Sequence, residues 1–189
     1  MSAAEHIAPM SVKDYLAWEE TQDQKYEYIG GIVYAMAGGT AIHATIALNV
    51  ASHLRNQLRG STCRTFVADL KIRTQVSEQD IFYYPDVFVA CDPDDAHAYY
   101  RERPRLVVEV LSKSTRRTDQ QEKRLTYQGI DSVQEILFIE QDSPRCNLLR
   151  RSGAEWQHLT ADGLDACLEL HSIDLNLPLE TVYEDVSFE

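Results

Sequence analysis

Short apolar runs recur along the chain and predict a protein built largely of β-strands. A hairpin is predicted at Tyr26–Ile29 and Ile32–Met36, because Gly30 and Gly31 between them tolerate the positive φ of a tight turn. The remaining strands are predicted at Cys63–Ala68, Leu70–Gln75, Ile81–Ala90, Leu106–Leu111, Glu135–Glu140, Arg145–Arg151 and Glu155–Thr160.

Helical spacing of apolar residues marks three segments between these strands. The first spans Ser11–Glu20, and the second and longest runs from His43 to Leu58. The third opens with a capping box formed by Thr118 and Gln121 and stops at Gly129. No internal repeat or linker interrupts the pattern, so we expect one α/β domain over residues 1–189.

The bulk composition adds few constraints. At 189 residues and 44% hydrophobic content the chain can bury a sizeable core. No apolar run approaches the ~20 residues of a membrane span, and no secretory signal is visible at Met1–Met10. The cysteines lack a Cys-x-x-Cys spacing, so we expect a cytoplasmic protein with reduced thiols at Cys63, Cys91, Cys146 and Cys167.

The net charge of −12 argues against a protein that coats nucleic acid, since such affinity comes largely from Lys and Arg. The charge is unevenly distributed, however. Basic residues outnumber acidic ones between Arg101 and Arg124, whereas Ala161–Glu189 contains no Lys or Arg. A solvated basic loop and helix would also explain this segment.

One glutamate stands out in the apolar strand Leu106–Leu111. Glu109 must lose its hydration there, which costs several kcal/mol (roughly) unless a cation or hydrogen bonds compensate. Asp86 lies in an earlier strand, and Lys123 lies in the third helix. Carboxylates on adjacent strands, with the carbonyl of Val110, could hold Mg²⁺, and Lys123 could orient the attacking water on a phosphodiester.

Taken alone, these residue types at this spacing occur by chance in many sequences. Asp86 could be a turn residue after Pro85, and Glu109 could form a buried ion pair with Arg105 or Lys123. Lys123 could equally be an exposed helix residue. The wider pattern is what favours a nuclease.

Several longer motifs resemble the Uma-two endonuclease family, also described as restriction endonucleases, of the PD-(D/E)xK nuclease superfamily. The resemblance covers about Val12 to Tyr183. It is carried by Tyr26-Glu27-Tyr28-Ile29-Gly30-Gly31-Ile32-Val33-Tyr34, Tyr84-Pro85-Asp86-Val87, Leu106-Val107-Val108-Glu109-Val110-Leu111-Ser112-x-Ser114-Thr115 and Asp119-x-x-x-Lys123-x-x-x-Tyr127.

The resemblance implies a restriction-endonuclease-like α/β core, with a central mixed β-sheet flanked by helices and preceded by an N-terminal helix and hairpin. It also implies Asp86 and Glu109 as Mg²⁺ ligands and Glu27 as a further acidic residue of the site. Where the superfamily lysine normally stands, two positions after Glu109, this chain has Leu111. The family pattern moves the lysine to the following helix, where Lys123 matches it.

Other polar residues are weaker candidates for substrate contacts. The resemblance places a histidine near the site at His43, although a satisfied core histidine is the alternative. Lys71, in the strand Leu70–Gln75, is a candidate to face the cleft. The basic segment adds Lys113, Arg116 and Arg117 as candidate phosphate contacts. Glu27 itself could be a solvent-facing strand residue, and Tyr127 is expected to be a packing residue with a polar tip.

The sequence therefore predicts a Mg²⁺-dependent endonuclease, with Mn²⁺ as a possible substitute, acting on DNA. Asp86 and Glu109 would hold the metal with Val110, Glu27 would support it, and Lys123 would position the nucleophile. Cutting both strands of a duplex predicts a homodimer. The alternative is an inactive nuclease fold that serves as a nucleic-acid-binding or oligomeric interaction module.

Overall fold

The computed structural model describes residues 8–111 and 119–188 of the chain. The central sheet within these residues runs in the order β11 (Glu155–Asp162), β10 (Arg145–Ser152), β9 (Glu135–Glu140), β8 (Pro104–Leu111), β6 (Val87–Ala90) and β3 (Arg64–Val67). Its β8–β9 pair is parallel and its other pairs are antiparallel. The predicted central mixed sheet is confirmed.

A second sheet, which the sequence did not predict as a separate layer, extends from the N-terminal hairpin. Its order is β2 (Ile32–Ala35), β1 (Tyr26–Ile29), β5 (Gln79–Tyr83), β4 (Lys71–Val76) and β7 (Tyr100–Arg101). The hairpin itself is confirmed, and Gly30 and Gly31 adopt φ values of 56° and 101°. A ribbon of β12 (Cys167–Leu170) and β13 (Leu175–Pro178) lies outside both sheets.

The helical segments are α1 (Val12–Glu19), α2 (Ala41–Gln57), the π-helix η1 (Asp119–Lys123), α4 (Arg124–Gln128) and α5 (Leu179–Val182). Ser11 caps α1 as predicted, because its hydroxyl accepts a hydrogen bond from the backbone N–H of Asp14. The capping box predicted at Thr118 lies outside the described residues. The end of the third helix at Gly129 is confirmed.

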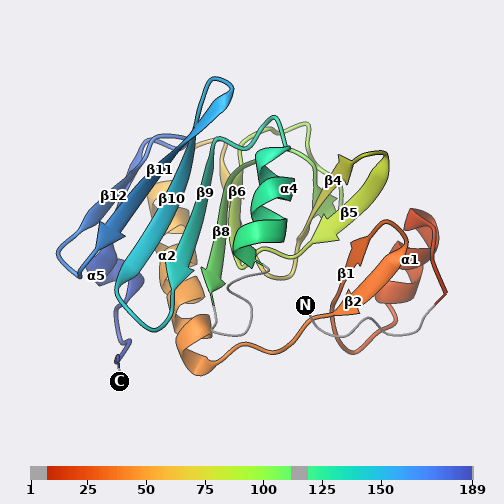
Figure 1. The fold of residues 1–189 in the computed structure, drawn as a ribbon, viewed down its shortest axis with the longest axis horizontal. Coiled ribbons are helices and arrows are strands. Elements are labelled where there is room, and N and C mark those ends of the chain that lie inside the picture. Colours follow the sequence, from red (N-terminus) through yellow and green to blue (C-terminus); the bar gives the residue numbers. More distant parts are fainter. Residues whose placement is uncertain (1–7, 112–118, 189) are drawn as a thin grey trace.

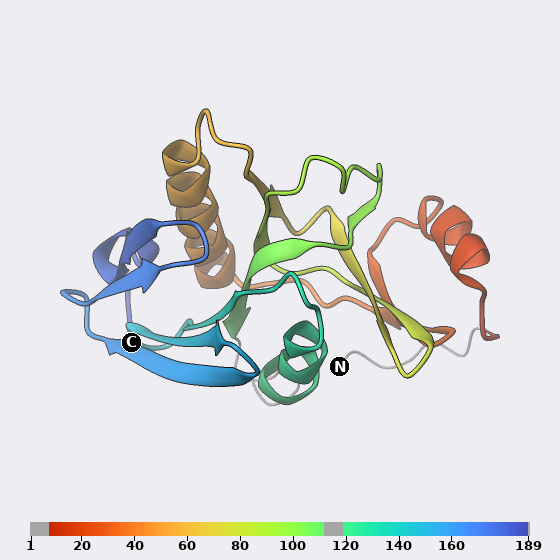
Figure 2. The ribbon, with the colours of Figure 1, turned by 90° about the horizontal axis from the view of Figure 1, so that it is seen from above.

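Helices cover both faces of the central sheet (Figures 1 and 2). α2 packs on one face, where Ile46, Val50 and Leu54 join a core with alternate residues of the sheet. α4 packs on the other face through Tyr127. α1 covers the second sheet with an aromatic cluster that includes Tyr15. The predicted α/β architecture with flanking helices is therefore confirmed.

The single strand predicted at Ile81–Ala90 is instead two strands in different sheets. β5 ends at Tyr83 and β6 begins at Val87. Pro85 between them has no backbone N–H and cannot contribute to a ladder, so the strand breaks there. The chain thus crosses from the second sheet into the central sheet through Tyr84-Pro85-Asp86, which puts Asp86 at the junction of the two sheets.

The expectation of reduced thiols is wrong for Cys63 and Cys91, which form a disulfide. The register explains the error: Arg64 pairs with Ala90 in the antiparallel β3–β6 ladder, so the two cysteines that flank these strands face each other. Their separation of 28 residues hides this in the sequence. Cys146 and Cys167 are free thiols, the first buried and the second exposed.

Two apolar stretches, Ile136–Ile139 and 175–179, belong largely to the core, so they offer little surface for the predicted dimer interface. Ile136–Ile139 is buried throughout β9. Leu177 and Leu179 are likewise buried in the cluster beneath α2. Across the described residues, no helix has both the length and the apolar character needed to cross a bilayer.

Candidate active site

Four charged side chains of the predicted site come from four separate elements. Glu27 lies in β1, Asp86 in the β5–β6 connection, Glu109 in β8 and Lys123 at the end of η1. The register brings two of them together: Val87 pairs with Val108, so Asp86 stands beside Glu109 where the ladder ends. The site therefore forms where the two sheets meet, against the helix that follows β8.

Lys123 is the cation of this cluster. Its ammonium lies 2.9 Å from Glu27 Oε1 and 3.4 Å from Glu109 Oε1. The residue is only 8% exposed, so the alternative of a solvent-facing helix residue does not hold. The ring of Tyr83 lies 5.3 Å away and adds a favourable cation–π contact. Lys123 thus contacts Glu109 from the helix, although this chain has Leu111 instead of a lysine two positions after Glu109.

Glu109 is 3% exposed, which makes its hydrogen bonds decisive. Besides Lys123, the hydroxyl of Tyr127 donates to Glu109 Oε1 over 2.6 Å. Burial first, and then the charge of Glu109, raise the pKa of Tyr127 well above its usual range, so this phenol stays protonated as a donor. The packing role expected for Tyr127 is present, together with this direct contact to the site.

Asp86 uses both carboxylate oxygens. Oδ1 lies 2.8 Å from His43 Nε2, and Oδ2 accepts a hydrogen bond of 2.7 Å from the backbone N–H of Val110. His43 reaches it from the first turn of α2, where Thr40 caps the helix. The carboxylate is thereby fixed against both β8 and α2, which orients it for binding.

Glu27 and Lys71 occupy neighbouring positions around Tyr84. Glu27 Oε1 accepts a hydrogen bond of 3.3 Å from the Tyr84 backbone N–H. Lys71 is 4% exposed, and its ammonium lies 2.8 Å from both Glu19 Oε2 and the Tyr84 hydroxyl. A substrate contact by Lys71 would therefore require this buried ion pair to open.

Three of the predicted substrate contacts cannot be placed. Lys113, Arg116 and Arg117 lie outside the described residues.

Two partners were considered for Glu109, namely Arg105 and Lys123, and Lys123 is the one that lies beside it. Arg105 sits near the start of β8 and is exposed.

The donors at this site suit a hard divalent cation. Mg²⁺ takes oxygen ligands and keeps several waters, so one or two carboxylates are enough to bind it. Asp86 and Glu109 supply such oxygens, and hydrogen bonds orient both carboxylates. Across residues 8–111 and 119–188, no three His, Cys, Asp or Glu side chains already converge as a ligand group.

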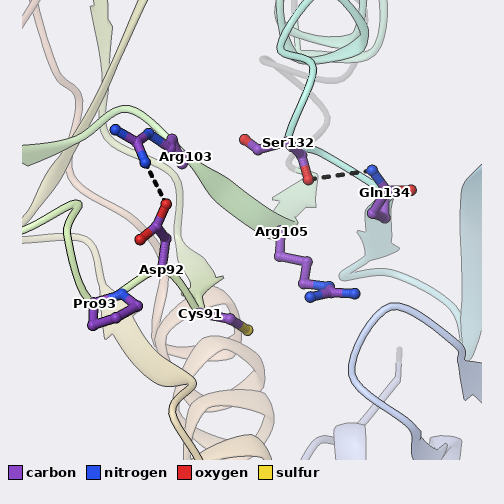
Figure 3. Close-up of a pocket in the computed structure, with 7 residues that line it drawn as sticks. All are labelled: Cys91, Asp92, Pro93, Arg103, Arg105, Ser132 and Gln134. Atoms are coloured by element: carbon purple, nitrogen blue, oxygen red, sulfur yellow. Dashed lines mark hydrogen bonds and ion pairs between the residues drawn. The ribbon is translucent and has the colours of Figure 1, made fainter.

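A cavity of about 450 Å³ lies away from these carboxylates, near the start of β8 (Figure 3). Its lining residues are Cys91, Asp92, Pro93, Arg103, Arg105, Ser132 and Gln134. Arg103 is paired with Asp92 there. None of the residues predicted for the site contributes to it, so the cavity does not mark the candidate active site.

The sequence did not reveal that His43 would bind Asp86 or that Tyr127 would bind Glu109. The second contact had a detectable signal, because Lys123 and Tyr127 are four residues apart and share a helix face. For the first, the resemblance placed His43 near the site, but its partner depends on how α2 packs against the β5–β6 connection.

A family model and two known proteins match most of this chain. A family model described as "Uma2: Putative restriction endonuclease" matches residues 12–180. The uncharacterised protein slr1290 of Synechocystis is 35% identical over 181 residues, which cover 95% of this chain and 94% of that protein. The uncharacterised protein sll1609 of the same organism is 30% identical over 135 residues, covering 70% of this chain and 75% of that one.

A solved structure shares the fold. It is the crystal structure of "a putative nuclease belonging to DUF820" from Anabaena variabilis, with a TM-score of 0.66 and 18% sequence identity. The match covers 92% of this chain and 97% of that chain. At this identity the likeness establishes the architecture alone.

Proposed function

Because the chain belongs to the Uma2 family of restriction-endonuclease-like proteins, we propose that it is a metal-dependent endonuclease that hydrolyses phosphodiester bonds in DNA. The observation that carries the proposal is the convergence of Lys123 on Glu27 and Glu109, at 2.9 and 3.4 Å, beside a fixed Asp86. A lysine among carboxylates where the two sheets meet is the set of groups that this hydrolysis needs.

In the proposed mechanism, Asp86, Glu109 and the carbonyl of Val110 would hold Mg²⁺ or Mn²⁺. When bound, the ion would stabilise charge on the phosphate and acidify a water. His43 keeps the Asp86 carboxylate oriented, and Tyr127 does the same for Glu109. Lys123 orients the attacking water and faces the developing negative charge, while Glu27 holds its ammonium in place.

The proposal also covers the domain organisation, the assembly and the cellular location of the protein. The chain acts as a single nuclease-like domain over 1–189, since Tyr84-Pro85-Asp86 joins its two sheets directly. It works as a homodimer. It resides in the cytoplasm, although the Cys63–Cys91 disulfide is more typical of oxidising compartments, so fractionation should accompany the activity assay.

One observation favours a second function, that of an inactive module that binds nucleic acid or a protein partner. Lys123 already neutralises Glu27 and Glu109, and a buried ion-pair network of this kind can exist for structure alone. The net charge of −12 and Leu111 in place of the usual lysine point the same way.

Cleavage assays separate the two functions. The protein should cut duplex, single-stranded or branched DNA with Mg²⁺ or Mn²⁺ and not with EDTA, and Asp86→Asn should abolish cutting. Either ion should raise the melting temperature of the wild type, because a ligand that binds the folded state stabilises it. The rise should be smaller for Asp86→Asn. Absence of both cleavage and metal-dependent stabilisation would leave the inactive module as the function.

A further inference from the structure

Arg124 follows Lys123 directly and is an unusual arginine. Its Nη2 donates to His158 Nε2 over 3.1 Å, and its Nε is buried without a hydrogen-bond partner. In the part of the chain that the structure describes, no carboxylate pairs with it. The buried Nε cannot reach a ligand in solvent, but the Nη groups of this half-buried residue can, and no carboxylate offsets their charge.

A second arginine without a carboxylate lies nearby on the β10–β11 hairpin. Arg151 donates to the carbonyls of Gln128, Ile130 and Val133 and stacks on Trp156, 4.5 Å from the ring centroid. Carbonyls are neutral, so they orient this guanidinium without cancelling its charge. Its position at the C-terminal end of α4 is also favoured by the helix dipole.

The strand register places these groups on one surface. Trp156 pairs with Arg151 and His158 with Leu149, so Trp156 and His158 share a face of β11 and meet α4 through Arg124. In Figure 2 the β10–β11 hairpin passes beside α4. Strand alternation directs Glu155 to the opposite face. We call Arg124, Arg151, Trp156 and His158 the α4–β11 surface.

We propose that the α4–β11 surface binds the sugar–phosphate backbone of the nucleic acid beside the bond to be cut. A planar guanidinium whose charge no carboxylate cancels attracts phosphate oxygens and can donate to them through its Nη groups. Arg124 is covalently next to Lys123, so a strand held here leads to the carboxylate cluster. The inference rests on the proposed nuclease function and explains how a chain of net charge −12 could hold a polyanion.

The experiment measures binding of a labelled duplex and a labelled single strand in EDTA, where no cleavage occurs. Arg124→Gln should weaken binding about tenfold, the equivalent of one charge-assisted hydrogen bond. The slope of log affinity against log salt should fall by about 0.7–0.9, because one phosphate contact is lost. Arg145→Gln is the matched control: it removes an equal charge from β10, where Arg145 is paired with Asp162 and is not part of the α4–β11 surface.

A second variant guards against misfolding. Leu125 follows Arg124 on α4 and is 70% exposed, so Leu125→Glu adds a negative charge next to the α4–β11 surface without disturbing the core, and it should weaken binding as well. Binding by both variants that equals the wild type would overturn the inference, as would failure of the wild type to bind. Cleavage that persists alongside such a result would keep the proposed function, whereas Arg124-dependent binding without any cleavage would keep the surface alone.

Discussion

Lys123 and Glu109 are both buried, at 8% and 3% exposure, and the ammonium of Lys123 compensates the charge of Glu109 as well as that of Glu27. Removing one partner of a buried pair leaves an uncompensated charge, which is far more damaging than losing a surface pair. The hydroxyl of Tyr127 would still reach Glu109, but a neutral donor replaces only part of the lost interaction.

Lys123→Ala should therefore lower the free energy of unfolding by about 3–5 kcal/mol, measured by urea denaturation. The same variant should lose cleavage while still being stabilised by Mg²⁺, because Asp86 and Glu109 remain. Lys25→Ala is the control: Lys25 pairs with Asp69 at the surface, with side chains 40% and 82% exposed, so it should cost about 0–1 kcal/mol. Equal stability losses in the two variants would contradict the buried-pair account.

For single residues, the sequence showed which residue types belong to the site more successfully than which contacts they make. Glu109 was conspicuous because a carboxylate in an apolar strand demands a partner, and Lys123 proved to be beside it. Lys71 looked similar in the sequence, yet Glu19 in α1 neutralises it. Which lysine meets which carboxylate depends on how separate elements pack, and local sequence spacing does not encode that.

Elements were predictable where local chemistry determines them. The hairpin at Gly30-Gly31 and the cap at Ser11 were both predicted correctly, because their determinants lie within a few residues. The split of Ile81–Ala90 into strands of two sheets was missed, although Pro85 marks the break. The Cys63–Cys91 bond was missed because it depends on the pairing of β3 with β6.

That disulfide ties the connection after α2 to the end of β6. Closing a loop with a separation of 28 residues should stabilise the fold by about 3–4 kcal/mol in the chain-entropy estimate. For a domain of this size, a reducing agent should lower the melting temperature by about 6–16 °C.

The control is the double variant Cys63→Ser with Cys91→Ser, whose melting temperature should not respond to the reducing agent. Thiol titration of the unreduced protein under denaturing conditions should detect Cys146 and Cys167 alone. A melting temperature of the wild type that is unchanged by reduction, with all cysteines titrating beforehand, would show that the bond does not form in solution.

For the molecule as a whole, the location of charge matters more than its sum. The net charge is −12, yet Arg124 and Arg151 lie close together with no carboxylate partner among the described residues. Acidic residues elsewhere would repel nucleic acid and restrict its approach to this side, which favours selectivity over affinity. Binding should therefore be weak and strongly dependent on salt.

Assembly is the remaining property of the whole molecule, and its interface has to be sought outside the buried stretch Ile136–Ile139. The described residues hold one copy of the carboxylate cluster per chain, whereas a duplex has two strands to cut. A symmetric dimer presents two such sites related by a two-fold axis, the commonest arrangement of oligomers. We therefore expect light scattering at micromolar concentration to give twice the chain mass of 21.6 kDa, with or without Mg²⁺.

Cleavage products give an independent check on the dimer. A dimer should convert supercoiled plasmid to the linear form with little nicked intermediate, because both strands are engaged in one encounter. A monomer would accumulate nicked circles first, since each cut needs a separate binding event. A monomer in light scattering together with nicked circles as the early product would contradict the homodimer, and would leave a nuclease that cuts one strand at a time.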